Sequence, residues 1–529
     1  MVKQLLRNII TSGTLILALS SLISRGLGLL RDKLFAYKFG ALGGTGIFDI
    51  DTYYAAFRLP DVIFQLLILG TISAAFVPIF SDFYYGDEKT RAWKFLNTTL
   101  SCLTLLTLAM ATMIFIFAPW IVPMMVPGFS PDKIDLTVHL TRIMLASPIL
   151  FCVSSIFQSV ENATKKYTHF ALAPIVYNLS IIIAALLFAD TYGVIAISYG
   201  VIIGAALHAL VQLPAIKNLG YRFTLNLEFR SRDFKNFIRL VIPRMLAIGI
   251  TQVNILVDTI IASTLTRGSI ASLNYALNIQ SLPLGLIGVS ISIVAFGIFS
   301  EQLSKKDASG AIETLREKLE TISIYIIPAT IGLLILSRPL VETLLQGGSF
   351  TRQDTELTSA LLGVLSLGLL AQSILPLLTR FLYAKKNTRT PVIMSVLGFI
   401  INISASLFFA RHLEWGVLGI GTGLVLSSIL QVTLLAWYIE HSERIQIFTH
   451  QERQKYQKML LATAGMGLIV WLIQMILSNT IPRIPLLTLI ISGLAGFVTY
   501  FFILQKLRYP KVKKFLVPSQ ITGKKKILS

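Results

Sequence analysis

The sequence contains little charge and only two cysteines. Charged residues make up 14% of its 529 residues and hydrophobic residues 54%, and the mean hydropathy is +0.73. Soluble proteins carry about 25% charged residues, so the composition excludes a soluble globular protein and indicates a polytopic membrane protein. Cys102 and Cys152 both fall in apolar segments, as small buried hydrophobic residues do, and imply no disulfide framework.

Motifs for nucleotide chemistry and metal binding are also missing. The chain has no P-loop, no dinucleotide fingerprint and no nucleophile elbow. Its six histidines show no metal-ligand spacing. We therefore predict that the chain does not hydrolyse ATP, and we expect no resident cofactor and no firm metal site. The net charge of +20 does not indicate nucleic-acid binding, because most basic residues lie in alternate loops between apolar segments.

Hydrophobic runs predict fourteen transmembrane helices in an all-α fold. The predicted spans are 8–38, 49–81, 93–118, 137–160, 169–189, 193–214, 237–265, 271–300, 319–337, 358–383, 391–410, 415–438, 459–478 and 484–505. Basic residues favour one set of loops by roughly fivefold, and both ends of the chain belong to that set. We therefore expect both termini to be cytoplasmic. The first run is expected to remain as a helix rather than to be cleaved as a signal peptide.

Three landmarks recur in the same order at offsets of 226 to 220 residues, close to six helices. They are Asp32-x-x-x-Ala36 and Asp258-x-x-x-Ala262, Leu59-Pro60 and Leu282-Pro283, and the stretches Ala75 to Asp82 and Ala295 to Glu301. The repeat predicts two parallel six-helix lobes, 1–216 and 217–440, followed by two helices and a basic tail in 441–529. Parallel repeats are typical of secondary transporters, whose sites lie between the lobes.

The first predicted helix carries charges in its second half, Ser24 to Asp32. Arg25 and Asp32 share one helix face, and Arg31 points about 100° away. Burying such charges against lipid costs at least a few kcal/mol each, so the pattern predicts a polar pathway or binding site. Two alternatives remain open: a structural ion cluster that locks the first helix to the second, and a helix that ends early and leaves the charges at the surface.

The second predicted helix carries Asp51 and Arg58 on one face. Seven residues separate them by about 10 Å along the axis, which is too far for a direct ion pair. Each therefore needs a partner from another helix or from a ligand. Arg58 is either an anion contact in a cavity or a residue that snorkels to the interface.

Asp258 is the clearest lone carboxylate of the second lobe, in an otherwise apolar segment. Possible oxygen partners are Asn402 and Ser406, one turn apart, and Thr422. One carboxylate with several oxygen ligands suits a weak site for a hard cation such as Na⁺. A protonatable aspartate and a purely structural aspartate are equally compatible with the pattern.

Aromatic residues near the predicted helix ends are interpreted as belts at the membrane–water interface. These residues are Tyr53, Tyr54, Tyr84, Tyr85, Trp120 and Trp415.

Several of these segments resemble the MurJ (MviN) family, lipid-linked peptidoglycan precursor flippases of the MOP transporter superfamily. The matching residues are Ser24 to Asp32, Phe39-Gly40-Ala41, Asp51 with Ala56 to Pro60, and Gly70 with Ser73 to Pro78. The resemblance covers the whole chain and implies a cavity that opens alternately to each membrane face. It implies an undecaprenyl diphosphate substrate carrying a disaccharide-pentapeptide, and a groove for the lipid tail at helices 13 and 14. Family-essential charges map to Arg25, Arg31, Asp32 and Asp51.

The sequence departs from the family pattern at several cavity positions. Phe64 and Gln65 stand where the family has two arginines, Leu69 where it has a glutamate, and Asn278 where it has another arginine. Arg244 is a candidate substitute from the second lobe. The predicted substrate-binding set is Arg25, Arg31, Asp32, Asp51, Arg58 and Arg244.

Together with this resemblance, the sequence predicts a multi-pass protein of the bacterial cytoplasmic membrane that is not an enzyme and that flips a lipid-linked glycan precursor by alternating access. The membrane potential or a gradient of Na⁺ or H⁺ would drive it, because no nucleotide site is present. Expected partners are the lipid-linked substrate, membrane lipids and cell-wall synthesis proteins. Three alternatives remain: a flippase for another polyprenyl-linked glycan, a drug or organic-cation antiporter of the same superfamily, and a non-transporting scaffold for cell-wall enzymes.

Overall fold

The computed structural model describes residues 13–69, 72–443, 445–447, 449–480 and 484–509. These residues form helices, and the only β contact among them is an isolated bridge between Gly347 and Phe350. The chain divides into two compact units. Unit 1 holds residues 1–275, 344–357 and 402–420, and unit 2 holds residues 276–343, 358–401 and 421–529. The units group helices by packing, whereas the predicted boundaries at 216 and 440 follow the repeat, so those boundaries stay a prediction.

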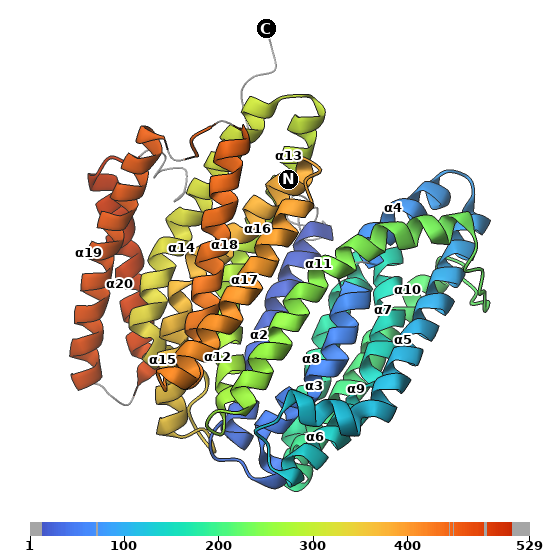
Figure 1. The fold of residues 1–529 in the computed structure, drawn as a ribbon, viewed down its shortest axis with the longest axis horizontal. Helices are drawn as coiled ribbons and strands as arrows, with labels where there is room; N and C mark the ends of the chain where they lie inside the picture. Colours follow the sequence, from blue (N-terminus) through green and yellow to red (C-terminus); the bar gives the residue numbers. More distant parts are fainter. Residues whose placement is uncertain (1–12, 70–71, 444, 448, 481–483, 510–529) are drawn as a thin grey trace, which may run out of the picture. The chain divides into compact units, whose positions relative to one another are not determined.

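Unit 1 is built mainly from the first half of the chain. Its elements are α2 (Gly13–Phe39), η1 (Gly46–Phe48), α3 (Ile50–Phe64), η2 (Gln65–Leu69), α4 (Ile72–Tyr85), α5 (Lys89–Met125), α6 (Pro131–Met144), α7 (Ala146–Ala163), α8 (Tyr167–Tyr192), α9 (Val194–Leu210), α10 (Leu213–Lys217) and α11 (Arg232–Ser263). Helix α8 packs against α2 and α9, and α7 packs against α5 and α9 (Figure 1).

Unit 2 is built mainly from the second half. Its elements are most of α12 (Ser269–Pro283), η3 (Leu284–Val289), α13 (Ser290–Ser304), α14 (Ala308–Leu344), most of α15 (Arg352–Leu367), α16 (Leu369–Ala384), most of α17 (Arg389–Leu407), most of α18 (Val417–Glu443), α19 (His450–Thr480) and α20 (Pro485–Lys506); η4 (Phe408–His412) belongs to unit 1. One buried cluster joins α13, α14, α16 and α18. A second joins α14 to the α19–α20 pair, coloured red in Figure 1.

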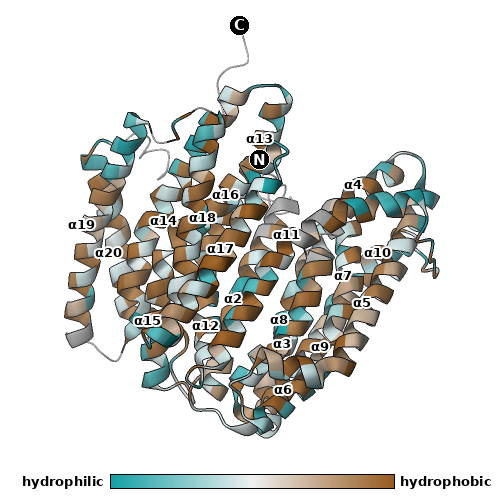
Figure 2. Ribbon diagram, viewed as in Figure 1, coloured by the Kyte–Doolittle hydropathy of each residue, from teal (hydrophilic) through white to brown (hydrophobic). Residues whose placement is uncertain are grey.

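Helices cover each of the fourteen predicted segments within the described residues, and the prediction of an all-α polytopic membrane protein is confirmed. Among the described residues, ten helical segments are long and apolar enough to cross a membrane, or eleven if the bent pair α15–α16 counts as one span. The number fourteen stays a prediction. Hydrophobic residues run along the helices and hydrophilic residues gather at their ends and in the loops (Figure 2).

The internal repeat has a counterpart in local geometry. A π-helical segment, η2, follows Leu59-Pro60, and a second one, η3, follows Leu282-Pro283 directly. Such wide turns are rare and often occur at functional sites. The repeated alanines Ala36 and Ala262 are both buried, as are Phe80 and Phe299 in the third landmark. The two copies therefore share a helical break and buried positions as well as sequence.

The aromatic belt at the interface stays a prediction, and one of its residues does not fit it. Tyr85, Trp120 and Trp415 have exposed side chains, as belt residues do. The prediction is wrong for Tyr53, which is 5% exposed and packs edge-on against Phe35 of α2. Periodicity at a helix end does not separate an interface residue from a buried one, because the packing partner comes from another helix.

Candidate functional site

The charged residues of α2 lie within unit 1 and contact α8. Arg31 Nη2 and Nε lie 2.9 and 3.2 Å from Asp32 Oδ1, and Asp32 is buried. Arg31 Nη1 also lies 3.4 Å from Asn178 Oδ1. Neighbouring positions on a helix do not face each other, but the long arginine side chain bends back to its neighbour. The structure therefore brings Arg31 and Asp32 together as an ion pair.

Arg25 lies on α2 and is half-buried. No carboxylate of the described residues forms an ion pair with it. Its positive charge is therefore available to an anionic ligand, whereas the charge of Arg31 is largely compensated by Asp32.

Arg58 reaches from α3 to α11 and α12. Its Nε donates to Thr259 Oγ1 at 3.1 Å, and its Nη2 donates to Asn274 Oδ1 at 3.0 Å. Both partners are neutral. Asp61 and Asp258 act on the guanidinium electrostatically, but among the described residues no carboxylate lies within ion-pair distance of it. Arg58 is therefore a half-buried cation held in position by neutral groups, an arrangement suited to binding an anion. The snorkelling alternative does not fit these contacts.

Asp258 lies at the centre of a small polar cluster in unit 1. Asn402 Nδ2 donates to its Oδ1 at 2.8 Å, and Asn254 Nδ2 lies 3.5 Å from its Oδ2. Ser406 Oγ donates to Asn402 Oδ1 at 3.4 Å. The structure thus brings together three of the four predicted cation ligands and adds Asn254. Thr422 belongs to unit 2.

Asp51 lies at the start of α3 and caps a different helix. Its Oδ2 accepts the backbone N–H of Gly268 at 2.8 Å, and its Oδ1 accepts the backbone N–H of Ala271 at 2.8 Å. The carboxylate, 2% exposed, thereby occupies the N-terminus of α12, where orphan amides favour an anion. Gly268 has φ +78°, and a Cβ there would meet the carbonyl oxygen of Ala41 at 2.6 Å.

Asp49 adds ion pairs beside this cap. Its Oδ2 lies 2.6 Å from Lys133 Nζ and 3.3 Å from Arg267 Nη2. Lys133 and Arg267 belong to the sparsely charged set of loops. The connections η1–α3, α6 and α11–α12 are therefore tied together on that membrane side. We refer to Asp49, Asp51, Lys133, Arg267 and Gly268 as the clasp.

The side chain of Arg244, within α11, lies outside the described residues. Its role stays a prediction. At two of the positions where the family arginines are absent, Phe64 packs against Phe151, and Gln65 Nε2 lies 3.3 Å from Asp61 Oδ1. Of the described residues, no group of three or more His, Cys, Asp or Glu side chains could hold a metal ion.

Sequence reasoning missed the residues that hold these charges in place. Asn178, Asn254 and Asn274 are amides inside apolar helices, a signal that could have identified them. Asp49 precedes the helix and bridges two cations, but nothing in the local sequence indicates partners more than 80 residues away.

The fold and the buried charges define a polytopic transporter of the MOP type. A solved structure described as "Lipid II flippase MurJ, inward closed conformation" aligns with a TM-score of 0.77 and 26% identity, over 93% of this chain and all of the other. An inward-facing MATE multidrug transporter shares the fold with a TM-score of 0.62 and 15% identity, over 79% of this chain and 94% of the other.

The family model described as "Lipid II flippase MurJ" matches residues 39–490. The "Probable lipid II flippase MurJ" of Bdellovibrio bacteriovorus is 27% identical over 94% of both chains. The "Lipid II flippase MurJ" of Burkholderia cenocepacia is 28% identical over 78% of this chain and 80% of its own. The chain belongs to the MurJ family of lipid II flippases.

Proposed function

We propose that this chain translocates lipid II, a polyprenyl-diphosphate-linked peptidoglycan precursor, across the bacterial cytoplasmic membrane. The observation that carries the proposal is the family match over residues 39–490. The protein is a transporter-type flippase, and it forms and breaks no covalent bond. A precursor-accessibility assay, described at the end of the Discussion, tests this function.

Arg58 and Arg25 would bind the diphosphate. Neither forms an ion pair with a carboxylate of the described residues, and charge-assisted hydrogen bonds to an anion are among the strongest in proteins. Arg31 is already paired with Asp32, so it would position this surface and add positive potential. Asp51, bonded to backbone amides of α12, would act by holding the clasp rather than by touching the substrate.

The lipid tail would lie along a groove of unit 2 between α14, α19 and α20. This groove has a volume of about 220 Å³ and is lined by small residues, including Gly332, Gly493 and Gly496, beside aromatic Phe497 and Tyr500. Small residues on facing helices leave room for an isoprenoid chain. The lining supports the tail groove that the resemblance implies.

Alternating access would move the diphosphate from one membrane face to the other, driven by the membrane potential or by a Na⁺ or H⁺ gradient. Asp258 is the proposed coupling residue. Its neighbour in sequence, Thr259, bonds Arg58 at 3.1 Å, so the anion contact and the polar cluster share one turn of α11. A cation or proton at Asp258 would change the potential felt by Arg58 and so couple ion binding to substrate binding. The carboxylate, amide and hydroxyl groups of the cluster offer the oxygen donors that a hard cation takes.

The coupling proposal predicts the phenotype of Asp258→Asn. The variant can keep the hydrogen bond from Asn402 through its amide oxygen but loses the titratable charge, so precursor binding is expected to persist. The dependence of transport on Na⁺ or pH is expected to flatten. The measurement is flipping in proteoliposomes as the Na⁺ or pH gradient is varied. If flipping by Asp258→Asn depends on Na⁺ or pH as the parent does, Asp258 has only a structural role.

A second prediction concerns Arg244, because Phe64, Gln65 and Asn278 stand where the family has arginines. Desolvating a diphosphate without cationic partners is costly, so Arg244→Ala is expected to weaken precursor binding while expression stays normal. Arg244→Lys is expected to recover only part of the binding, because lysine cannot form bidentate contacts. Binding of the precursor to purified protein measures both. If Arg244→Ala binds the precursor with parental affinity, Arg244 does not replace the absent arginines.

The same departures support one second candidate, a flippase for another polyprenyl-linked glycan. The headgroup contacts differ from the family pattern, whereas the diphosphate and lipid tail would be common to both substrates. Competition between lipid II and other polyprenyl diphosphate glycans for the purified protein separates the two.

The proposed orientation places both termini and the basic loops in the cytoplasm. Lys89, Lys165 and Lys305 all lie in loops or helix ends of that set, in agreement with the positive-inside rule. The clasp would then lie on the extracytoplasmic side. Cell-wall synthesis proteins on either side are the expected protein partners.

A further inference from the structure

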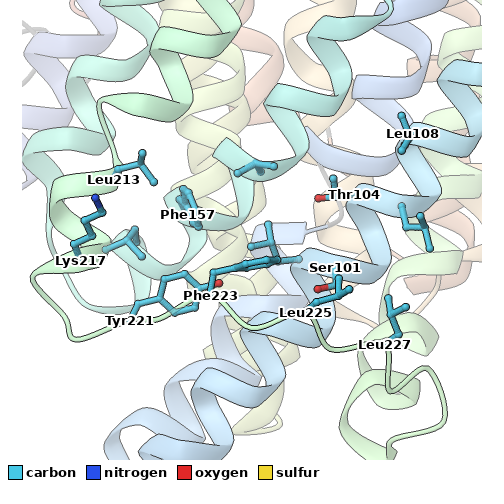
Figure 3. Close-up of a pocket in the computed structure, with 14 residues that line it drawn as sticks. Ser101, Thr104, Leu108, Phe157, Leu213, Lys217, Tyr221, Phe223, Leu225 and Leu227 are labelled. Atoms are coloured by element: carbon cyan, nitrogen blue, oxygen red, sulfur yellow. The ribbon is translucent and has the colours of Figure 1, made fainter.

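An apolar pocket of about 560 Å³ lies in unit 1, and none of the buried charges described above lines it (Figure 3). It is bounded by α5, α7, α10 and the loop 218–231 that follows α10. Leu105 and Leu108 come from α5, Phe157 from α7, and Phe223 and Leu225 from the loop. The volume is within the range of small-molecule sites, about 300–1,000 Å³.

Side chains of the loop 218–231 alternate in direction as they do along an extended strand. Tyr221, Phe223, Leu225 and Leu227 line the pocket at every second position. In extended backbone, alternate side chains point to opposite sides. Segment 221–227 therefore presents a continuous apolar edge to the pocket. The intervening residues can form hydrogen bonds with α5.

Hydrogen bonds to α5 fix this edge. Tyr221 donates its hydroxyl to Asn97 Oδ1 at 2.6 Å, and Asn97 Nδ2 donates to Thr224 Oγ1 at 2.8 Å. Further along, the backbone N–H of Asn226 bonds Ser101 Oγ at 3.3 Å. Burial raises the pKa of Tyr221, so its hydroxyl stays protonated and remains a donor. Hydrogen bonds thus connect the loop wall of the pocket to the α5 wall.

Its depth in the membrane follows from α5. Trp120, 62% exposed, is the interface residue near the far end of this helix. A hydrocarbon core of about 30 Å corresponds to about 20 helical residues, which places Leu100 at the opposite boundary. The pocket residues from Leu100 to Leu108 therefore span about 12 Å along α5, most of the hydrocarbon depth of the leaflet on the side of the basic loops.

One cation borders the pocket. Lys217 at the end of α10 lines it. Phe223 and Leu225 are 58% and 72% exposed. Large apolar side chains in a basic loop are unfavourable in water and typical of an interfacial anchor. An apolar chamber bordered by the cation of Lys217 is complementary to an acyl chain of a lipid with an anionic headgroup.

We propose that this pocket binds an anionic phospholipid of the basic-side leaflet, with an acyl chain between α5 and the loop 218–231 and the phosphate headgroup at Lys217. The occupant is a bilayer lipid, separate from the translocated precursor. Since one wall of the pocket is the connection that leads into α11, a bound lipid would hold this connection against α5 and α7.

Photolabelling tests the site in the full-length protein. The protein is reconstituted in phosphatidylethanolamine vesicles containing a minor fraction of phosphatidylglycerol with a diazirine in its acyl chain. Labelled peptides are expected from α5 near Leu105 and from the loop near Leu225, and unlabelled phosphatidylglycerol should displace the probe. Each basic residue near an anionic surface contributes about fivefold in binding, so Lys217→Ala should lower labelling by about fivefold.

Matched variants separate the pocket from general lipid contact. Leu108→Trp fills the pocket from α5 and should abolish labelling there, whereas Leu187→Trp, on the lipid-exposed face of α8, should leave it unchanged. Lys235→Ala with Arg239→Ala removes two exposed basic residues of α11 that do not line the pocket, and parental labelling is expected. Equal labelling by a diazirine phosphatidylcholine, displacement by lipid II but not by phosphatidylglycerol, or insensitivity to Leu108→Trp would each overturn the proposal.

Discussion

Replacement of Arg58 by alanine is expected to reduce translocation by tenfold to a hundredfold or more. A hydrogen bond to a charged group contributes about 1.5–3 kcal/mol, and each 1.4 kcal/mol corresponds to a factor of ten. Thr259 and Asn274 would keep their positions but face no guanidinium. The measurement is the rate of lipid II flipping in proteoliposomes, with precursor binding measured on the same preparation.

Two control variants test whether the loss of flipping is specific to the guanidinium of Arg58. Arg352→Ala removes an arginine whose side chain is 76% exposed and should leave flipping at the parental rate. Arg58→Lys keeps the charge but cannot form both side-chain contacts in the same geometry, so an intermediate rate is expected. Parental flipping by Arg58→Ala would show that the diphosphate is bound elsewhere.

Removal of the Asp51 carboxylate is expected to destabilise the protein strongly. Asp51→Ala leaves the backbone amides of Gly268 and Ala271 without their acceptor in a buried site. Each unsatisfied buried donor costs about 1–3 kcal/mol, so the expected loss of unfolding free energy is about 2–6 kcal/mol. Thermal unfolding of the purified variant in detergent measures the change.

Asp51→Asn should lose less stability, because its amide oxygen can still accept one of the two N–H groups. Asp135→Ala removes an exposed carboxylate from α6, close in sequence to Lys133, and should have little effect. If Asp51→Ala unfolds at the parental temperature, the cap on α12 contributes nothing and the family-essential charge acts on the substrate instead.

The helical fold could be predicted because its signal is local. Long apolar runs identify helices such as α5 and α8 without any knowledge of their partners. The repeat was also visible, and the π-helical segments η2 and η3 after the two Leu-Pro pairs agree with it. Helix ends and breaks were less certain, since they depend on packing. The predicted span 137–160, for example, is divided between α6 and α7.

The candidate site could be predicted only in part, because its partners lie far apart in sequence. The pattern identified Arg58 as needing a partner from another helix, and Thr259 and Asn274 supply it from 201 and 216 residues away. The pattern could not identify the partner of Asp51, since backbone amides leave no trace in the sequence. Arg31 and Asp32 point about 100° apart on the helix. The long arginine side chain nevertheless reaches the Asp32 carboxylate.

The most direct test of the account is where lipid II accumulates when the protein is depleted from cells. Intact cells are exposed to an impermeant enzyme that cleaves lipid II only on the outer leaflet, and the cleaved fraction is measured with and without the protein. The account predicts that the cleaved fraction falls as the protein is lost, while total lipid II rises, and that Arg352→Ala restores cleavage but Arg58→Ala does not. Outer-leaflet lipid II at the parental level after complete depletion would contradict it.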